Sequence, residues 1–253
     1  MGILDGRTVM ITGAASGIGE ATAKEAAAEG ATLMLCDVDA AKGGAVAAAI
    51  GAAATYRDCD VTDEAAVEAA VAATVSELGG IDGAFNCAGI LGVVGNIGEL
   101  PLDGWKQLID VDLNGVFLCT KHQVNAMAEK GGSILNMASA AGLIGWAGAS
   151  GYVAAKHGVV GLSKAAALEY AEQGIRVNAL CPSYVMTPMV EKDLFEDTLG
   201  NDEELIAAAR ANHPIGRFAQ PPEIAAAAVW LLSDKASFVT GTAMPVDGGY
   251  TAP

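Results

Sequence analysis

The sequence predicts an α/β fold in which helices cover both faces of a single parallel β-sheet, and three observations support this. Short apolar runs alternate with longer stretches of helical periodicity along the chain. A glycine cluster follows the first apolar run and precedes a helical stretch. Hydrophobic residues make up 52% of the 253 residues, and many of them are alanines, which allow helices to pack closely on a buried sheet. We therefore expect a doubly wound sheet.

Seven strands are predicted, at residues 8–11, 32–36, 54–57, 83–86, 133–137, 176–180 and 243–246. The helical stretches between them cover residues 17–29, 40–50, 63–78, 103–129, 151–172 and 222–232. Thr62, Asp63 and Glu64 mark one helix start, because acidic side chains are favoured near the positive end of the helix dipole. This alternation predicts one seven-stranded parallel sheet.

One segment departs from the alternation. Residues 188–214 form a helix-like insertion rich in Asp and Glu. A long excursion at such a point often covers a binding site, so we expect it to close over the substrate; a surface elaboration is the alternative. The chain shows no linker and no short-period repeat, so residues 1–253 are expected to form a single domain.

Composition argues against several kinds of partner. The formal net charge of −16 disfavours nucleic acid and anionic membrane surfaces, which attract basic patches. Residues 131–155 are uncharged and long enough to cross a bilayer, but they contain six Gly, three Ser and one Asn. Residues 1–7 lead directly into the first predicted strand without an apolar run. We expect neither a membrane span nor a secretory signal.

Cysteine and histidine usage predicts a reducing compartment and no metal site. Five widely spaced cysteines form no metal knuckle or redox pair, so we expect small buried thiols in a cytoplasmic protein. The three histidines are equally scattered. The residues concerned are Cys36, Cys59, Cys87, Cys119, Cys181, His122, His157 and His213.

The glycine cluster has the pattern of a phosphate-binding loop. It runs from Thr12 to Gly19, where the first strand hands over to a helix. Gly13 permits a tight turn, Gly17 lets the backbone approach a pyrophosphate, and Gly19 lets the helix pack on the sheet. The phosphates would meet free N–H groups at the helix start, so a dinucleotide is the expected ligand.

Asp37 ends the second predicted strand and indicates which dinucleotide binds. A carboxylate at this place accepts hydrogen bonds from the adenosine ribose hydroxyls and repels a 2′-phosphate. No Arg or Lys stands at Ala15, Ser16 or Val38 to attract such a phosphate. We therefore expect NAD rather than NADP, the alternative being that Asp37 only caps a turn.

Tyr152 and Lys156 supply a candidate acid/base. Residues four apart share one face of a helix, so the ammonium would lie near the phenol. At about 4 Å and an effective dielectric near 20, the cation is worth roughly 4 kcal/mol and lowers the phenol pKa of about 10 by about three. The phenol would then exchange protons near neutrality. The alternative is an ordinary helical pair.

With these residues assembled, the chain from residue 4 to 253 resembles the classical short-chain dehydrogenase/reductase family, which has a Rossmann fold. The match rests on the Gly13, Gly17 and Gly19 spacing, the Asn86-Cys87-Ala88-Gly89 turn, Asn114, and Ser139 thirteen residues before Tyr152. Cys87 departs from the family's Asn-Asn-Ala-Gly turn, and Ser183 replaces the usual Gly after Pro182.

The resemblance implies a role for each matched residue. Tyr152 is the acid/base, Lys156 lowers its pKa and binds the nicotinamide ribose, Ser139 orients the substrate oxygen, and Asn114 holds a water that links Lys156 to solvent. The tail, residues 237–249, resembles the segment that builds a homotetramer in relatives. The implied NAD contacts are Gly13, Ser16, Gly17, Ile18, Gly19, Asp37, Val38, Asp60, Val61, Asn86, Ala88, Gly89, Tyr152, Lys156, Pro182, Val185 and Thr187.

The expected activity is hydride transfer between NAD and an uncharged, apolar secondary alcohol or ketone. Residues 213–218 and the tail look similar to relatives that act on alicyclic alcohols and diols, and hydroxysteroids are the other expected class. The alternatives are a 3-oxoacyl-[acyl-carrier-protein] reductase and a non-catalytic NAD-binding protein. The predicted substrate pocket is apolar and comprises Ile90, Leu91, Leu143, Trp146, Tyr184, Met186, Met189 and Phe195.

Overall fold

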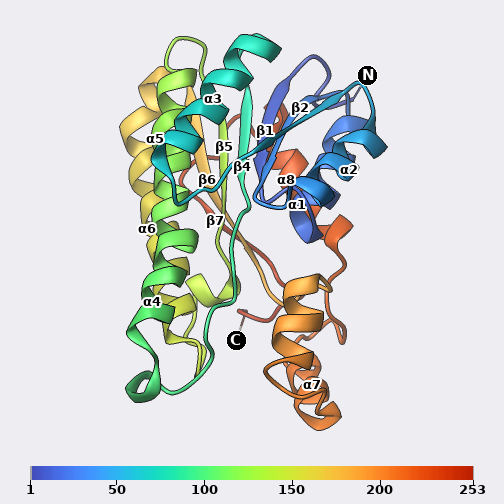
Figure 1. Ribbon diagram of the computed structural model, residues 1–253, viewed down its shortest axis with the longest axis vertical. Helices are drawn as coiled ribbons and strands as arrows, with labels where there is room; N and C mark the ends of the chain where they lie inside the picture. The colour runs from blue at the N-terminus through green and yellow to red at the C-terminus, as the bar shows by residue number, and fades with distance from the viewer. Residues whose placement is uncertain (1, 253) are drawn as a thin grey trace.

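The computed structural model describes residues 2–252 and contains one parallel sheet with strand order β3-β2-β1-β4-β5-β6-β7 (Figure 1). The prediction of a doubly wound, seven-stranded parallel sheet is confirmed. Each predicted strand is present, and several extend one or two residues further toward their carboxyl ends. The strands are β1 Thr8–Thr12, β2 Thr32–Asp37, β3 Ala54–Asp58, β4 Gly83–Asn86, β5 Gly132–Met137, β6 Ile175–Pro182 and β7 Ala243–Val246.

Helices pack on both faces of the sheet. On one face lie α1 (Gly17–Ala28), α2 (Ala40–Ile50) and α8 (Pro221–Leu232), whose buried alanines, valines and leucines share a core cluster with β1 and β2. On the other face lie α3 (Glu64–Leu78), α5 (Gly115–Met127) and α6 (Ser150–Tyr170). The sheet is thus buried between two helical layers, as its near-continuous apolar strands require.

The predicted helix at residues 103–129 is interrupted. It consists of α4 (Leu102–Ile109) and α5, joined by a π-helical turn at Asp110–Asn114. A π-helical turn accommodates one extra residue and so rotates the side chains that follow it; such turns are frequent at functional sites. Here the turn places the side chain of Asp112 fully inside the protein.

The insertion at residues 188–214 contains a π-helical segment, Met189–Glu196, and helix α7 (Glu203–Ala211). Asp202 caps α7 by accepting hydrogen bonds from the Glu204 and Leu205 amides at 2.9 and 3.2 Å. Leu194 and Phe195 are buried in a separate apolar cluster. Figure 1 shows α7 projecting beyond one end of the sheet.

Strand order reverses between β1 and β4, so the chain winds outward from these two neighbours. Ligands of such sheets bind at this switch point, beyond the carboxyl ends of the strands. Across residues 2–252, no helix combines the length and apolarity needed to cross a bilayer. Within the same residues, no three His, Cys, Asp or Glu side chains gather as metal ligands would.

Candidate active site

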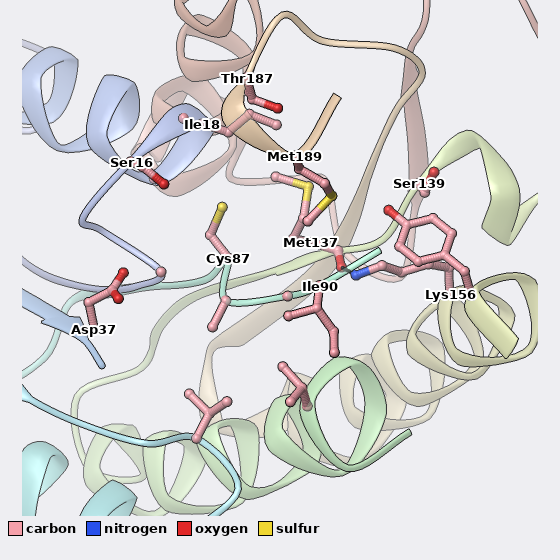
Figure 2. Close-up of a pocket in the computed structure, with 18 of the residues that line it drawn as sticks. Ser16, Ile18, Asp37, Cys87, Ile90, Met137, Ser139, Lys156, Thr187 and Met189 are labelled. Atoms are coloured by element: carbon pink, nitrogen blue, oxygen red, sulfur yellow. Dashed lines mark hydrogen bonds between the residues drawn. The ribbon is translucent and has the colours of Figure 1, made fainter. Parts of the chain in front are cut away.

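A cavity of about 960 Å³ lies along the carboxyl ends of β1, β2, β4, β5 and β6. Figure 2 shows its length, with Ser16 and Asp37 toward one end and Ser139 and Lys156 toward the other. Cys87, Thr187 and Met189 lie between these ends. The cavity is therefore elongated, with a carboxylate near one end and hydroxyl and ammonium groups near the other.

Glycines allow close approach to the backbone in the cradle between β1 and α1, beside the side chains of Ser16 and Ile18. Gly13 adopts φ +67°, and a Cβ there would lie 2.6 Å from the Ala88 nitrogen. A Cβ at Gly19 would lie 2.1 Å from the Gly13 carbonyl oxygen. Ser16 is extended and makes no side-chain cap, so the first N–H groups of α1 are available to a ligand. This cradle fits a pyrophosphate, which needs close backbone approach and free helix N–H groups.

The Asp37 carboxylate is held at the far end of the cavity by two backbone amides. Oδ2 accepts from the Ala15 N–H at 2.9 Å, and Oδ1 accepts from the Asp39 N–H at 3.0 Å. Asp37 therefore does support local turns, and its remaining lone pairs face the cavity. Among residues 2–252, the cations lining this cavity are Lys106 and Lys156, neither of which belongs to the glycine loop or to β2.

Sixteen of the seventeen residues expected to contact NAD line this cavity, and Asn86 does not. The Asn86 amide is buried, donating to Gln123 Oε1 and Asn136 Oδ1, both at 2.9 Å. It also accepts from Gln123 Nε2 at 2.8 Å. Asn86 thus ties β4 to β5 and α5 beneath the cavity floor.

Ser139, Tyr152 and Lys156 meet at the other end of the cavity. Helix α6 carries Tyr152 and Lys156 one turn apart, and the ammonium lies 5.3 Å from the phenol ring centre. Lys156 is 2% exposed and donates to the Met137 carbonyl at 3.1 Å. The Ser139 hydroxyl accepts from the Ala141 amide at 3.1 Å, which fixes it at the end of β5.

The helix residue that contacts Lys156 is Asp112, and the structure keeps Asn114 away from the cavity. The Asp112 carboxylate lies 3.0 Å from Lys156 Nζ, is 0% exposed, and accepts from the Ile90 amide at 2.8 Å. Asn114 is exposed and donates to Asp110 Oδ1 at 2.9 Å. The sequence analysis assigned this place to Asn114 by its resemblance to the family's helix asparagine, whereas the structure puts Asp112, two residues earlier, beside Lys156.

Burial and charge act against each other on the two proton-exchanging groups. Burial raises the pKa of Tyr152 above its ordinary value; Lys156 lowers it and the Asp112 carboxylate raises it further. Burial lowers the pKa of Lys156, but Asp112 and Tyr152 outweigh burial and raise it, which keeps the ammonium charged. The sequence analysis expected a Tyr152 pKa near neutrality because it included the effect of Lys156. It did not include the effects of burial and of the Asp112 carboxylate, which both raise that pKa.

A second, smaller cavity adjoins the first. Ser139, Tyr152, Ser183, Met189 and Val190 line both cavities, so they meet at the phenol of Tyr152. The other residues lining the smaller cavity are Leu91, Ala140, Ala141, Ile144, Trp146, Tyr184, Leu194 and Tyr250. Most of them are apolar, which suits an uncharged ring.

Five of the eight residues predicted to contact the substrate line one or both of these cavities. Leu91, Trp146, Tyr184 and Met189 line the smaller cavity, and Ile90 and Met189 line the larger one. Three predicted residues line neither. Met186 and Phe195 belong to the apolar cluster behind the cavity wall, and Leu143 packs against another cluster.

The sequence analysis missed two polar residues of the smaller cavity. Tyr250 directly follows the 237–249 tail, about a hundred residues after Tyr152, and no local pattern connects the two. Ser183 was noted only as a departure from the family's Pro-Gly turn. That replacement of a glycine by a serine was the one sequence feature that could have indicated a hydroxyl in the cavity.

Comparisons with known proteins agree along the whole chain. The family model described as enoyl-(acyl carrier protein) reductase matches residues 13–251. A 2,5-dichloro-2,5-cyclohexadiene-1,4-diol dehydrogenase of Sphingobium indicum is 47% identical over 100% of both chains. A cyclohexanol dehydrogenase of an Acinetobacter species is 44% identical, over 97% of this chain and 95% of the relative.

The crystal structure of levodione reductase superposes with a TM-score of 0.95 and 42% identity, covering 98% of this chain and 99% of that one. Fold, full-length identity and the family match lead to the same assignment. This chain belongs to the short-chain dehydrogenase/reductase family of oxidoreductases.

Proposed function

We propose that this chain transfers a hydride between NAD and an uncharged alicyclic secondary alcohol or the corresponding ketone. The observation that carries the proposal is the meeting of Ser139, Tyr152 and Lys156 where a dinucleotide-sized cavity adjoins an apolar one. Residues 1–253 act as one catalytic domain, in which the 188–214 segment covers the substrate. Leu194 of that segment lines the smaller cavity and supports this role.

In the proposed reaction Tyr152 is the acid/base. During alcohol oxidation its phenolate takes the hydroxyl proton, and during ketone reduction its phenol returns it. Ser139 hydrogen-bonds the same substrate oxygen and orients the carbon for transfer. A nicotinamide dinucleotide held in the larger cavity would supply the hydride acceptor or donor. Lys156, held by Asp112 and the Met137 carbonyl, would stabilise the phenolate and bind the nicotinamide ribose.

The substrate class follows from the smaller cavity and from the relatives. The cavity wall offers no lysine or arginine among the described residues, so a carboxylate or phosphate would find no cation there. The names of the relatives specify ring substrates: a cyclohexadiene-diol, cyclohexanol and levodione. An alicyclic alcohol, diol or hydroxysteroid therefore suits this site best.

The cofactor preference is expected to depend on Asp37. Changing Asp37→Ala removes the carboxylate that would accept the ribose hydroxyls and repel a 2′-phosphate, so the ratio of kcat/KM for NAD over NADP should fall at least tenfold. Steady-state kinetics with both cofactors measures this ratio. Asp39→Ala, which removes a neighbouring, half-buried carboxylate that caps α2, is the matched control. Equal use of NAD and NADP by the unaltered protein would refute the assignment.

The proposed activity is tested by incubating the protein with NAD and a panel of cyclic and steroid alcohols, and following NADH absorbance. We expect turnover of alicyclic alcohols that depends on Tyr152. Turnover of 3-oxoacyl thioesters with NADPH instead would favour the acyl-carrier-protein reductase. Tight NAD binding without turnover of any substrate would favour a non-catalytic binding protein.

We also propose a cytoplasmic homotetramer. Several large apolar side chains are exposed on the protomer, including Phe238, Leu168 on α6 and Phe117 on α5, which is typical of surfaces that pack against other subunits. Five free cysteines suit a reducing compartment. Light scattering after size exclusion should give a molar mass four times that of the chain. In the Leu168→Glu variant the measured mass should fall toward that of a dimer or monomer.

A further inference from the structure

Ser183 is held from behind by a buried histidine, while its hydroxyl lines the substrate cavity. It follows β6 directly and lines both cavities beside Tyr152. Its Oγ lies 2.9 Å from His213 Nε2 and 3.2 Å from the Asp247 carbonyl oxygen. The hydroxyl thus has two protein partners, the His213 imidazole and the Asp247 carbonyl.

The hydrogen bonds of His213 fix where its proton lies. His213 follows α7, is 2% exposed, and packs against the Tyr250 ring at a centroid distance of 5.0 Å. Its Nδ1 lies 3.0 Å from the Ala209 carbonyl, which can only accept, so Nδ1 carries the hydrogen. In the neutral imidazole, Nε2 then has a lone pair and accepts from the Ser183 hydroxyl.

This arrangement leaves Ser183 Oγ as an acceptor. Its one hydrogen is directed to His213, with the Asp247 carbonyl as a longer alternative. Within residues 2–252, no backbone amide or other hydroxyl donates to this oxygen. A lone pair of Ser183 Oγ is therefore available to a ligand that brings a hydrogen-bond donor.

The other hydroxyls of the smaller cavity belong to Ser139 and to the tyrosines Tyr152, Tyr184 and Tyr250. Ser139 and Tyr152 act on the reacting oxygen in the proposed function. Burial and the neighbouring Tyr250 raise the pKa of Tyr184 to about 12, and the rings of the two tyrosines pack edge to face at a centroid distance of 6.0 Å. Ser183 Oγ is thus an acceptor on the cavity wall that the proposed chemistry of Ser139 and Tyr152 leaves unused.

We propose that Ser183, backed by His213, accepts a hydrogen bond from a second hydroxyl on the substrate ring, and that the preferred substrates are alicyclic diols. The inference rests on the proposed function and names its substrate class more narrowly. A ring with one hydroxyl leaves the Ser183 lone pair without a donor in a largely apolar cavity. The transition state for a mono-alcohol is therefore bound less tightly than the transition state for a diol.

The test compares cyclohexanol with the 1,2-, 1,3- and 1,4-cyclohexanediols as substrates, with NAD in excess. For the unaltered protein, kcat/KM for at least one diol should exceed that for cyclohexanol about tenfold or more. Ser183→Ala should lower this diol-to-cyclohexanol ratio about tenfold, and Ser183→Gly should do the same. Ser76→Ala on α3, remote from both cavities, should leave the ratio unchanged and serves as the matched control.

His213 is tested by rescue. His213→Gln keeps an acceptor near Ser183 and should preserve more of the diol preference than His213→Leu. An equal loss in both variants would remove His213 from this role. Tyr250→Phe tests the nearest competing hydroxyl, and a loss of preference there, with none in Ser183→Ala, would overturn the assignment to Ser183.

The outcomes also separate this inference from the proposed function. Oxidation of cyclohexanol and all diols with equal kcat/KM would leave the proposed function standing and refute the diol preference. Absence of NADH formation from every alcohol would refute the proposed function itself.

Discussion

Tyr152→Phe is expected to lower kcat/KM for alcohol oxidation by about 10²–10⁴-fold, the contribution that a positioned acid/base makes. The change removes one oxygen atom and leaves the ring beside Lys156 and the apolar cavity. Because the glycine cradle and Asp37 are distant from this oxygen, the affinity for NADH should change less than about threefold. Steady-state kinetics and fluorescence titration with NADH measure the two effects separately.

Tyr170→Phe is the matched control, because Tyr170 ends the same helix and lies outside both cavities. It should retain full activity. If Tyr152→Phe also retained activity, the acid/base would have to be another group. If Tyr152→Phe lost NADH affinity as well as activity, the change would have disturbed the cavity, and the kinetic loss would not identify the proton acceptor.

Substitution of Asp112 is expected to give the second large effect, and two variants separate its contribution to stability from its contribution to catalysis. Asp112→Leu leaves the Lys156 ammonium buried without its carboxylate, which should lower the free energy of unfolding by about 3–5 kcal/mol. Asp112→Asn keeps an oxygen for the Ile90 amide and removes only the charge, so the protein should remain folded. Urea titration of both variants gives the stabilities.

The Asp112→Asn variant should also shift the pH profile toward acid. Alcohol oxidation needs the Tyr152 phenolate, so its rate rises with pH through the pKa of that phenol. The Asp112 carboxylate raises this pKa and the Lys156 ammonium lowers it. Removing the carboxylate charge therefore lowers the pKa, and the rising limb of kcat/KM should move down by about 1 pH unit. The charged groups facing the phenol are Lys156 and Asp112; the Ser139 hydroxyl lies beside it, and burial raises the pKa of the nearby Cys87 thiol to about 12, so that thiol stays neutral.

Asn114→Ala decides between the two residues of this helical turn. The resemblance assigned a catalytic role to Asn114, whereas the geometry links Asp112 to Lys156. A loss of activity in Asn114→Ala with an unchanged profile in Asp112→Asn would return the role to Asn114. A profile that moved toward alkaline pH in Asp112→Asn would contradict the electrostatic argument.

Much of the site was predictable because the relevant signals are local. The Gly13, Gly17 and Gly19 pattern, Asp37 at a strand end, and the four-residue step from Tyr152 to Lys156 all lie within one strand–helix unit or one helix. The structure brings these three groups to one cavity because parallel strands end at the same edge of the sheet.

The groups that the sequence analysis missed depend on contacts between distant segments. Asp112 faces Lys156 because a π-helical turn rotates it inward, and helical periodicity alone does not predict that turn. Ser183 meets His213 thirty residues later, after the chain has passed through α7. Tyr250, just after the 237–249 tail, lines the same cavity.

Sequence by itself thus determined the parallel sheet, the cradle for a dinucleotide and the face that carries Tyr152 and Lys156. These follow from short-range periodicity and from conformations that only glycine adopts easily. Tertiary structure decided which charge neighbours Lys156, how deeply Tyr152 is buried, and which side chains shape the substrate cavity. Burial and long-range pairing set those features, because desolvation and Coulomb energies depend on the three-dimensional surroundings of a group rather than on its neighbours along the chain.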